Sequence, residues 1–236
     1  MISRRFIQKA NEVKTGKRKR VMVFAPHPDD DILGCGGSIC WHRAQGHEVS
    51  IVYLTCGEAG TRAGSSQELK TRRQDEARQG AALLEVQDLI FLGFPDGGLE
   101  IQEETLDRVI QLLREKRPYT IYFPHIGELH RDHVKTCELV SEACRRAAGP
   151  WHPRCGPEPW EVGCALTYEV WSPLPCVNLV RNITPFMDLK IQALRKHESQ
   201  LLEIAYDEGI LGLNRYRGVT TGRGVYCECF QVVKAR

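Results

Sequence analysis

The chain has 236 residues, and 32 Lys and Arg against 30 Asp and Glu give a formal net charge of +2. Its 42% hydrophobic and 26% charged residues are ordinary for a globular protein and exclude a disordered or collagen-like chain. The balanced charge argues against nucleic acid as a partner, because nucleic-acid-binding proteins usually carry a basic excess or stripe. No stretch approaches the roughly 18 apolar residues of a membrane span. The N-terminus also lacks the apolar core of a signal peptide, so we expect a cytoplasmic location.

Short apolar runs alternate with amphipathic stretches along the chain. The runs typical of strands cover 21–25, 49–54, 89–92, 119–123, 165–171, 176–183 and 225–233. Helical patterns cover 38–44, 67–84, 103–116, 134–147 and 185–204. Strands that alternate with helices indicate a parallel sheet with right-handed crossovers. We therefore expect one domain over residues 1–236, with an α/β, Rossmann-like three-layer fold and a mainly parallel sheet.

Two polar segments follow predicted strands. Residues 26–31 read PHPDDD after the first strand, and residues 130–133 read HRDH after the fourth. Sites in open α/β sheets form at the carboxyl ends of the strands, so we expect both segments at one edge. Each segment alone could simply begin or cap a helix. Together they are better explained by a divalent metal ion, which would offset the three adjacent carboxylates.

A catalytic zinc site typically has three protein ligands and an open position. Bound zinc lowers the pKa of water from 15.7 towards about 7. A carboxylate and a histidine left over from the ligand set could then act as general base and as electrophile or acid. The glycine-rich segment 34–37 lacks the full GxGxxG order, which argues against nucleotide binding.

These segments also carry a family resemblance. PHPDDDILGCGGSI (26–39) resembles the AHPDDE-type motif of the LmbE-like (PIG-L) N-acetylglucosaminyl deacetylases, and HRDHV (130–134) resembles their second motif. Further similar segments are LTCGEAG (54–60), RQDEA (73–77), FPDGGL (94–99) and KIQALRKHESQ (190–200). These segments follow the order and spacing of the family, and together they extend over nearly the whole chain.

The resemblance implies a zinc-dependent hydrolase that removes an acetyl group from an N-acetylglucosamine-type amino sugar or its conjugate. It implies His27, Asp30 and His133 as the zinc ligands. A site of this donor set could also accept Fe²⁺, cobalt or manganese. The family resemblance further implies a homo-oligomer, either a trimer or a hexamer.

The resemblance assigns the chemistry to three more side chains. Asp29 would be the general base for the attacking water. His130 would stabilise the oxyanion or protonate the departing amine, and Asp132 would orient and charge His130. Arg73 and His197 are candidates for contacts with the substrate. Arg73 could equally form a surface salt bridge, and His197 could equally cap a neighbouring carbonyl.

The sequence departs from the family pattern at three positions. Asp31 stands where Glu is usual, which keeps the charge but shortens the reach of the carboxylate as a hydrogen-bond acceptor. Arg131 replaces a common Pro. Glu128 and Leu129 stand near the place where some members have a tyrosine, so the sequence offers no tyrosine at these positions for an oxyanion contact.

Two alternative functions remain open at this level. The same site would serve a metal-dependent amidase acting on a thiol-conjugate or another acylated amine. A non-catalytic metal- or nucleotide-binding α/β protein is the alternative outside enzymes, but it would have no use for a spare base and a spare histidine.

Overall fold

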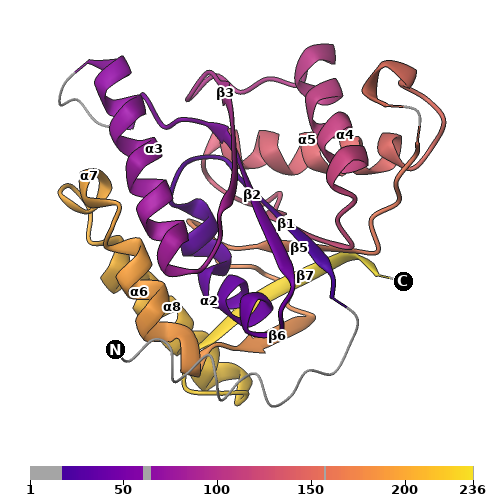
Figure 1. Ribbon diagram of the computed structural model, residues 1–236. Helices are drawn as coiled ribbons and strands as arrows, with labels where there is room; N and C mark the ends of the chain where they lie inside the picture. Colours follow the sequence, from indigo (N-terminus) through magenta and orange to yellow (C-terminus); the bar gives the residue numbers. More distant parts are fainter. Residues whose placement is uncertain (1–17, 61–64, 157, 236) are drawn as a thin grey trace.

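The computed structural model describes residues 18–60, 65–156 and 158–235. One sheet has the strand order β3-β2-β1-β4-β5-β7-β6 (Figure 1). The strands are β1 (Arg20–Ala25), β2 (Glu48–Thr55), β3 (Asp88–Phe94), β4 (Thr120–Pro124), β5 (Cys164–Tyr168), β6 (Leu179–Asn182) and β7 (Cys227–Ala235). From β3 to β5 all neighbours are parallel, and β7 runs antiparallel to both β5 and β6. The predicted mainly parallel sheet is confirmed.

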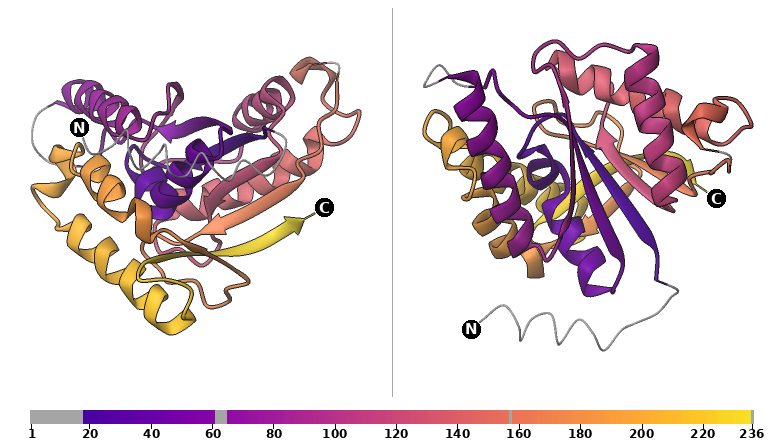
Figure 2. Two further views of the ribbon diagram at one scale, coloured as in Figure 1. Left: turned by 60° about the horizontal axis from the view of Figure 1, so that its bottom comes forward. Right: turned by 45° about the horizontal axis from the view of Figure 1, so that its top comes forward.

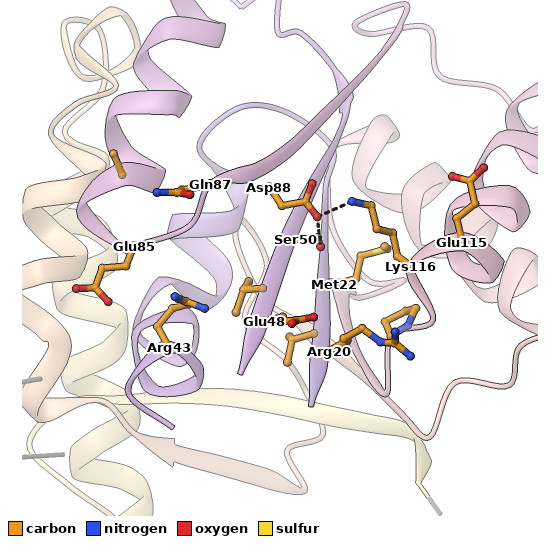
Figure 3. A pocket seen from close by; sticks show the side chains of 14 residues that line it. Arg20, Met22, Arg43, Glu48, Ser50, Glu85, Gln87, Asp88, Glu115 and Lys116 are labelled. Atoms are coloured by element: carbon orange, nitrogen blue, oxygen red, sulfur yellow. Dashed lines mark hydrogen bonds and ion pairs between the residues drawn. The ribbon is translucent and has the colours of Figure 1, made fainter. Parts of the chain in front are cut away.

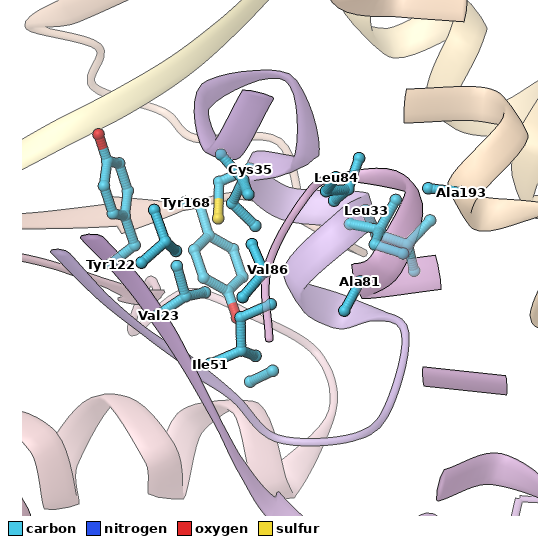
Figure 4. Packing of buried hydrophobic residues seen from close by; sticks show 14 of the residues in the cluster. Val23, Leu33, Cys35, Ile51, Ala81, Leu84, Val86, Tyr122, Tyr168 and Ala193 are labelled. Carbon is cyan, nitrogen blue, oxygen red and sulfur yellow. The ribbon is translucent and has the colours of Figure 1, made fainter. Parts of the chain in front are cut away.

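Helices cover both faces of this sheet, which confirms the three layers (Figures 1 and 2). They are α2 (Asp30–Ala44), α3 (Ser66–Leu83), α4 (Glu103–Lys116), α5 (Arg131–Ala147), α6 (Met187–Leu194), α7 (Glu198–Leu201) and α8 (Tyr206–Thr221), with short 3-10 turns at Pro153–Cys155 and Thr184–Phe186. Side chains alternate along β1. Val21, Val23 and Ala25 pack beneath α2, α3 and α6, whereas Met22 and Phe24 pack against α4 and α5. Figure 4 shows part of the hydrophobic cluster on the side of the sheet that α2, α3 and α6 cover.

Helix α2 begins well before the predicted start at residue 38, and the glycine-rich segment lies inside it. The helix kinks at Cys35, where φ is −148°. These glycines provide close packing: a Cβ on Gly34 would lie 2.2 Å from the ring of Tyr168, and a Cβ on Gly37 would lie 2.7 Å from Ile183. The prediction missed the first turns because glycine is a poor helix former and the pattern there is typical of a loop.

The predicted helix over 185–204 is wrong, because the chain turns at His197 between α6 and α7. The prediction also missed α8, which follows directly. Three glycines lower its intrinsic helix propensity. One of them, Gly218, leaves no room for a side chain, because a Cβ there would lie 2.2 Å from the carbonyl oxygen of Val225. Among the described residues no helix is long and apolar enough to cross a membrane. All ten cysteines are free thiols.

A buried ion pair bridges the kink in α2. The Lys190 ammonium, which is fully buried, donates to Glu228 at 2.8 Å and to Asn214 at 3.0 Å. Glu228 in turn accepts from the backbone N–H groups of Gly37 and Ser38, both at 2.8 Å. The carboxylate therefore satisfies donors that the kink leaves without an intrahelical partner.

The buried His42 predicts a specific pH dependence of stability. Its Nε2 lies 2.8 Å from the Tyr122 hydroxyl, and burial, together with the nearby Arg181 charge, holds the pKa of His42 well below its usual value. The unfolded chain therefore binds a proton below about pH 6.5 that the folded chain does not, so this contribution to stability is lost as the pH falls. Relative to His42→Gln, the native chain should lose about 1.4 kcal/mol of unfolding free energy per pH unit between pH 6 and pH 5. Urea unfolding at both pH values measures this difference, and parallel pH profiles would contradict it.

Candidate metal and catalytic site

The two polar segments meet at the carboxyl edge of the sheet, as expected. Segment 26–31 follows β1, segment 130–133 opens α5, and β1 pairs with β4 in parallel. The ring centroid of His27 lies 4.8 Å from that of His130 and 5.4 Å from that of His133. Residues more than 100 positions apart in the sequence therefore form one polar cluster.

The predicted ligand atoms converge on one carboxylate oxygen. Asp30 Oδ2 lies 3.0 Å from His27 Nδ1 and 3.2 Å from His133 Nε2. Two ligands of a tetrahedral zinc ion, each about 2.0–2.1 Å from the metal, are roughly 3.3 Å apart. His133 is fully buried, and its two ring nitrogens face the carboxylates of Asp30 and Glu128 without forming a hydrogen bond of regular geometry to any described residue. These donors therefore fit a divalent metal ion. The ring nitrogens of His27, His130 and His133 form an alternative ligand set, within 4.8 Å of one another.

The electrostatics of the cluster also favour a bound cation. Burial alone would raise the pKa of Asp30, but the neighbouring His133 and His27 outweigh it and hold that pKa far below its usual range. Burial would lower the pKa of His133, but Asp30 and Glu128 outweigh it and raise the value to about 9. The carboxylates thus raise the pKa values of His27 and His133 and favour their protonated forms. A metal ion bound here would displace those protons, because it needs neutral imidazole ligands.

Asp29 has a strained backbone and a carboxylate that does not cap its helix. It stands at the N-cap of α2 with φ 137° and ψ −30°, yet its side chain makes no capping hydrogen bond. The carboxylate instead lies 3.2 Å from Arg73 Nη2. Burial raises the pKa of Asp29 to about 7, although the Arg73 charge opposes the rise. Strain at such a position is typical of functional sites, where it aims a side chain.

Arg73 is buried, with 3% of its surface exposed, and it contacts the site. Besides pairing with Asp29, its guanidinium donates to two backbone carbonyl groups in the loops after β1 and β2, at 2.8 and 3.1 Å. The alternative of a surface salt bridge with Asp75 or Glu76 is wrong, because Arg73 is buried and pairs with Asp29. Arg72 pairs with Glu76 at 3.0 Å and Arg78 with Asp75 at 2.7 Å instead. A contact between Arg73 and substrate stays a prediction.

His130 and Asp132 lie at the start of α5. The backbone N–H of Asp132 donates to His130 Nδ1 at 3.2 Å. The Asp132 carboxylate accepts from the N–H groups of Gly97 and Leu99, at 2.7 and 3.2 Å, and lies 3.2 Å from His27 Nε2. Through these contacts Asp132 connects the loop after β3 with the candidate ligand His27. The predicted orientation of His130 by the Asp132 carboxylate stays a prediction.

His197 lies between α6 and α7 and is fully buried. Neither ring nitrogen has a hydrogen-bond partner among the described residues, so the structure offers no carbonyl that His197 caps. Burial, with the nearby Arg73 charge, lowers the pKa of His197 to about 3, which keeps the ring neutral. A contact of His197 with a sugar stays a prediction.

The structure adds residues to which the motifs gave little weight. Asp96 Oδ1 lies 3.1 Å from His27 Nε2, and Glu58 accepts from the Asp96 N–H at 3.2 Å. Both belong to segments that carry the family resemblance, which was the available signal. Asp31 accepts a hydrogen bond despite its short side chain, because the Tyr53 hydroxyl donates to its Oδ2 at 3.2 Å.

A second group of metal-ligand types lies outside this cluster. Asp107, His152 and Cys155 offer one donor atom each within 4.8 Å of one another. However, His152 Nε2 lies 3.1 Å from Arg146 Nη1 and Asp107 pairs with Arg154. These arginines already compensate the charge of the group, so we assign no metal there.

A cavity of about 750 Å³ lies at the opposite, amino-terminal edge of the sheet (Figure 3). Charged side chains of both signs line it. Asp88 pairs there with Lys116 at 2.7 Å and accepts from Ser50 at 2.7 Å. The cavity is therefore separate from the polar cluster, and its charges are partly paired with one another.

Comparisons with known proteins agree with the cluster. Residues 22–144, just over half of the chain and the part that contains both polar segments, match the model of the PIG-L family, GlcNAc-PI de-N-acetylase. The chain belongs to the PIG-L family. It is 31% identical over 198 residues to the diacetylchitobiose deacetylase of Thermococcus kodakarensis, covering 80% of this chain and 73% of that protein.

Two solved structures with this fold have different enzymatic activities. The N,N'-diacetylchitobiose deacetylase of Pyrococcus horikoshii superposes with a TM-score of 0.83 at 26% identity, covering 99% of this chain and 93% of that one. The 4-carboxy-2-hydroxymuconate hydratase of Pseudomonas putida reaches 0.81 at 22% identity, covering 92% and 97%. Because a hydratase shares the fold, the fold alone does not fix the reaction. Membership of this PIG-L family of N-deacetylases rests on the sequence matches.

Proposed function

We propose that this PIG-L family member is a zinc-dependent hydrolase that removes the acetyl group from an N-acetylglucosamine-type amino sugar or its conjugate. The deacetylase relatives support the reaction, and the convergence of His27, Asp30 and His133 supports the metal. Zn²⁺ bound to these three residues would polarise the acetamide carbonyl and lower the pKa of water.

The residues around the ligands supply the proton transfers. Asp29 accepts the proton of the attacking water, and its pairing with Arg73 fixes the direction of the carboxylate. His130, half-buried beside His27, either protonates the departing amine or stabilises the negative charge that develops on the carbonyl oxygen. Acetate and a free amine are the products.

One observation carries this proposal. Asp29 adopts a backbone conformation that non-glycine residues rarely have, and its carboxylate faces Arg73 instead of capping α2. A metal-binding module without catalysis would have no need to hold a second carboxylate in this way beside its ligand Asp30.

Acetate release from a panel of acylated amines tests the function and ranks the substrates. The panel contains N-acetylglucosamine, its β-linked disaccharide, an α-glycoside of N-acetylglucosamine, a thiol-conjugate amide and a simple N-acetyl amine. We expect acetate from one or more of the sugars, loss of that activity with a chelator, and recovery with Zn²⁺. Turnover of the thiol-conjugate alone would favour the alternative amidase. Chelator-insensitive turnover would contradict the role of zinc.

A further inference from the structure

Glu128 is a buried carboxylate in the loop between β4 and α5 for which the proposed mechanism has no role. Its side chain is completely enclosed. It accepts hydrogen bonds from three consecutive backbone N–H groups after β5, those of Val170 at 2.8 Å, Trp171 at 3.0 Å and Ser172 at 3.3 Å. This carboxylate therefore fixes the segment 170–172 against the loop that leads into HRDH.

The same carboxylate faces the candidate ligand His133 from behind. Glu128 Oε2 lies 3.4 Å from His133 Nδ1, on the opposite side of the ring from Asp30, which is 3.2 Å from Nε2. A second imidazole, His125, also approaches Glu128 at 3.4 Å, but its Nε2 has a shorter contact with the carbonyl oxygen of Ser172 at 2.8 Å. Glu128 is therefore the acceptor available to an N–H at Nδ1 of His133.

The segment that Glu128 holds carries an exposed aromatic residue. Trp171 is 40% exposed and packs edge-on against Tyr206, with ring centroids 5.0 Å apart. One buried carboxylate thus connects a candidate ligand with a partly exposed aromatic pair.

We propose that Glu128 is a positioning residue with two effects. Its carboxylate accepts the Nδ1–H of His133, so that Nε2 faces the metal, and it fixes the position of segment 170–172 relative to His133. A carboxylate in this place fixes the tautomer of a ligating histidine and raises its basicity. This inference rests on the proposed metal role of His133.

The variant Glu128→Gln tests the proposal, with Glu138→Gln as the matched control. Glu138 lies on the same helix as His133 but pairs with Lys135 at the surface. Loss of a carboxylate behind a ligating histidine typically weakens metal binding about 10–100-fold. We expect this loss of Zn²⁺ affinity for Glu128→Gln and no change for Glu138→Gln, measured by competition with a chromophoric chelator on folded protein. Saturating Zn²⁺ should restore much of kcat, because Asp29 and His130 are unchanged.

A measurement on the native chain covers the case in which Glu128→Gln does not fold. In ¹⁵N-histidine NMR spectra of the zinc-loaded protein, His133 should have a protonated Nδ1 and a metal-bound Nε2. Ligation through Nδ1, or Zn²⁺ affinity of Glu128→Gln within twofold of native, would overturn the inference while leaving the proposed function intact. A native chain that binds no Zn²⁺ would overturn both.

Discussion

Replacing Asp29 with Asn is expected to lower kcat/KM for acetate release by about 10²–10⁴-fold while Zn²⁺ stays bound, because the variant loses the general base but no ligand. Asn has almost the same shape as Asp and is one of the residue types most tolerant of a positive φ, so the strained turn before α2 should survive. The Arg73 contact, 3.2 Å in the native chain, loses its charge but keeps an acceptor oxygen. Steady-state kinetics and zinc content by elemental analysis measure the two effects separately.

Asp75→Asn is the matched control for this variant. Asp75 forms an exposed pair with Arg78 on α3, so its substitution should leave both kinetics and zinc content unchanged. If Asp29→Asn lost zinc together with activity, Asp29 would be a ligand rather than the base. If it kept full activity, the mechanism would be wrong.

Replacing Lys190 with Met should destabilise the fold by about 3–5 kcal/mol, because it leaves the carboxylate of Glu228 buried without its cation. Lys190 and Glu228 are 0% and 1% exposed at their side chains. Glu228 would still accept from the N–H groups at the α2 kink, so the helix stays capped but the charge is uncompensated. Urea unfolding at pH 7 measures the change.

Lys116→Met provides the comparison at a partly exposed pair. Lys116 and Asp88 are 2.7 Å apart, with side chains 38% and 42% exposed, and such pairs contribute about 0–1 kcal/mol. The double variant Lys190→Met with Glu228→Gln should be more stable than Lys190→Met alone, since it removes the unpaired charge. A loss for Lys190→Met no larger than that for Lys116→Met would contradict this account of the pair.

Local patterns were sufficient for the parallel part of the fold. The apolar runs of β1 and β4 and the helix over 103–116 follow from short-range periodicity, and the last agrees with α4 to the residue. Tertiary contacts decided the places where prediction failed. The glycines of α2 are held in a helix by packing against β5 and by Glu228 from β7, which no window of local sequence contains.

The candidate site was predictable to a similar degree. The rule that sites form at the carboxyl ends of strands was enough to place segments 26–31 and 130–133 in one cluster, and the family resemblance selected His27, Asp30 and His133 within them. The sequence could not show that Arg73 turns inward to Asp29, since a helical arginine beside acidic residues usually forms a surface pair. It also gave no sign that Glu128 contacts His133, because that contact depends on the path of the loop after β4.

Titration of the metal-free chain with Zn²⁺, with acetate release followed at each addition, tests the central claim most directly. The account predicts that activity on an N-acetylglucosamine derivative rises in proportion to bound zinc and reaches its plateau near one ion per chain. Acetate release that is already maximal in the metal-free chain, or a chain that binds no divalent metal at all, would contradict it.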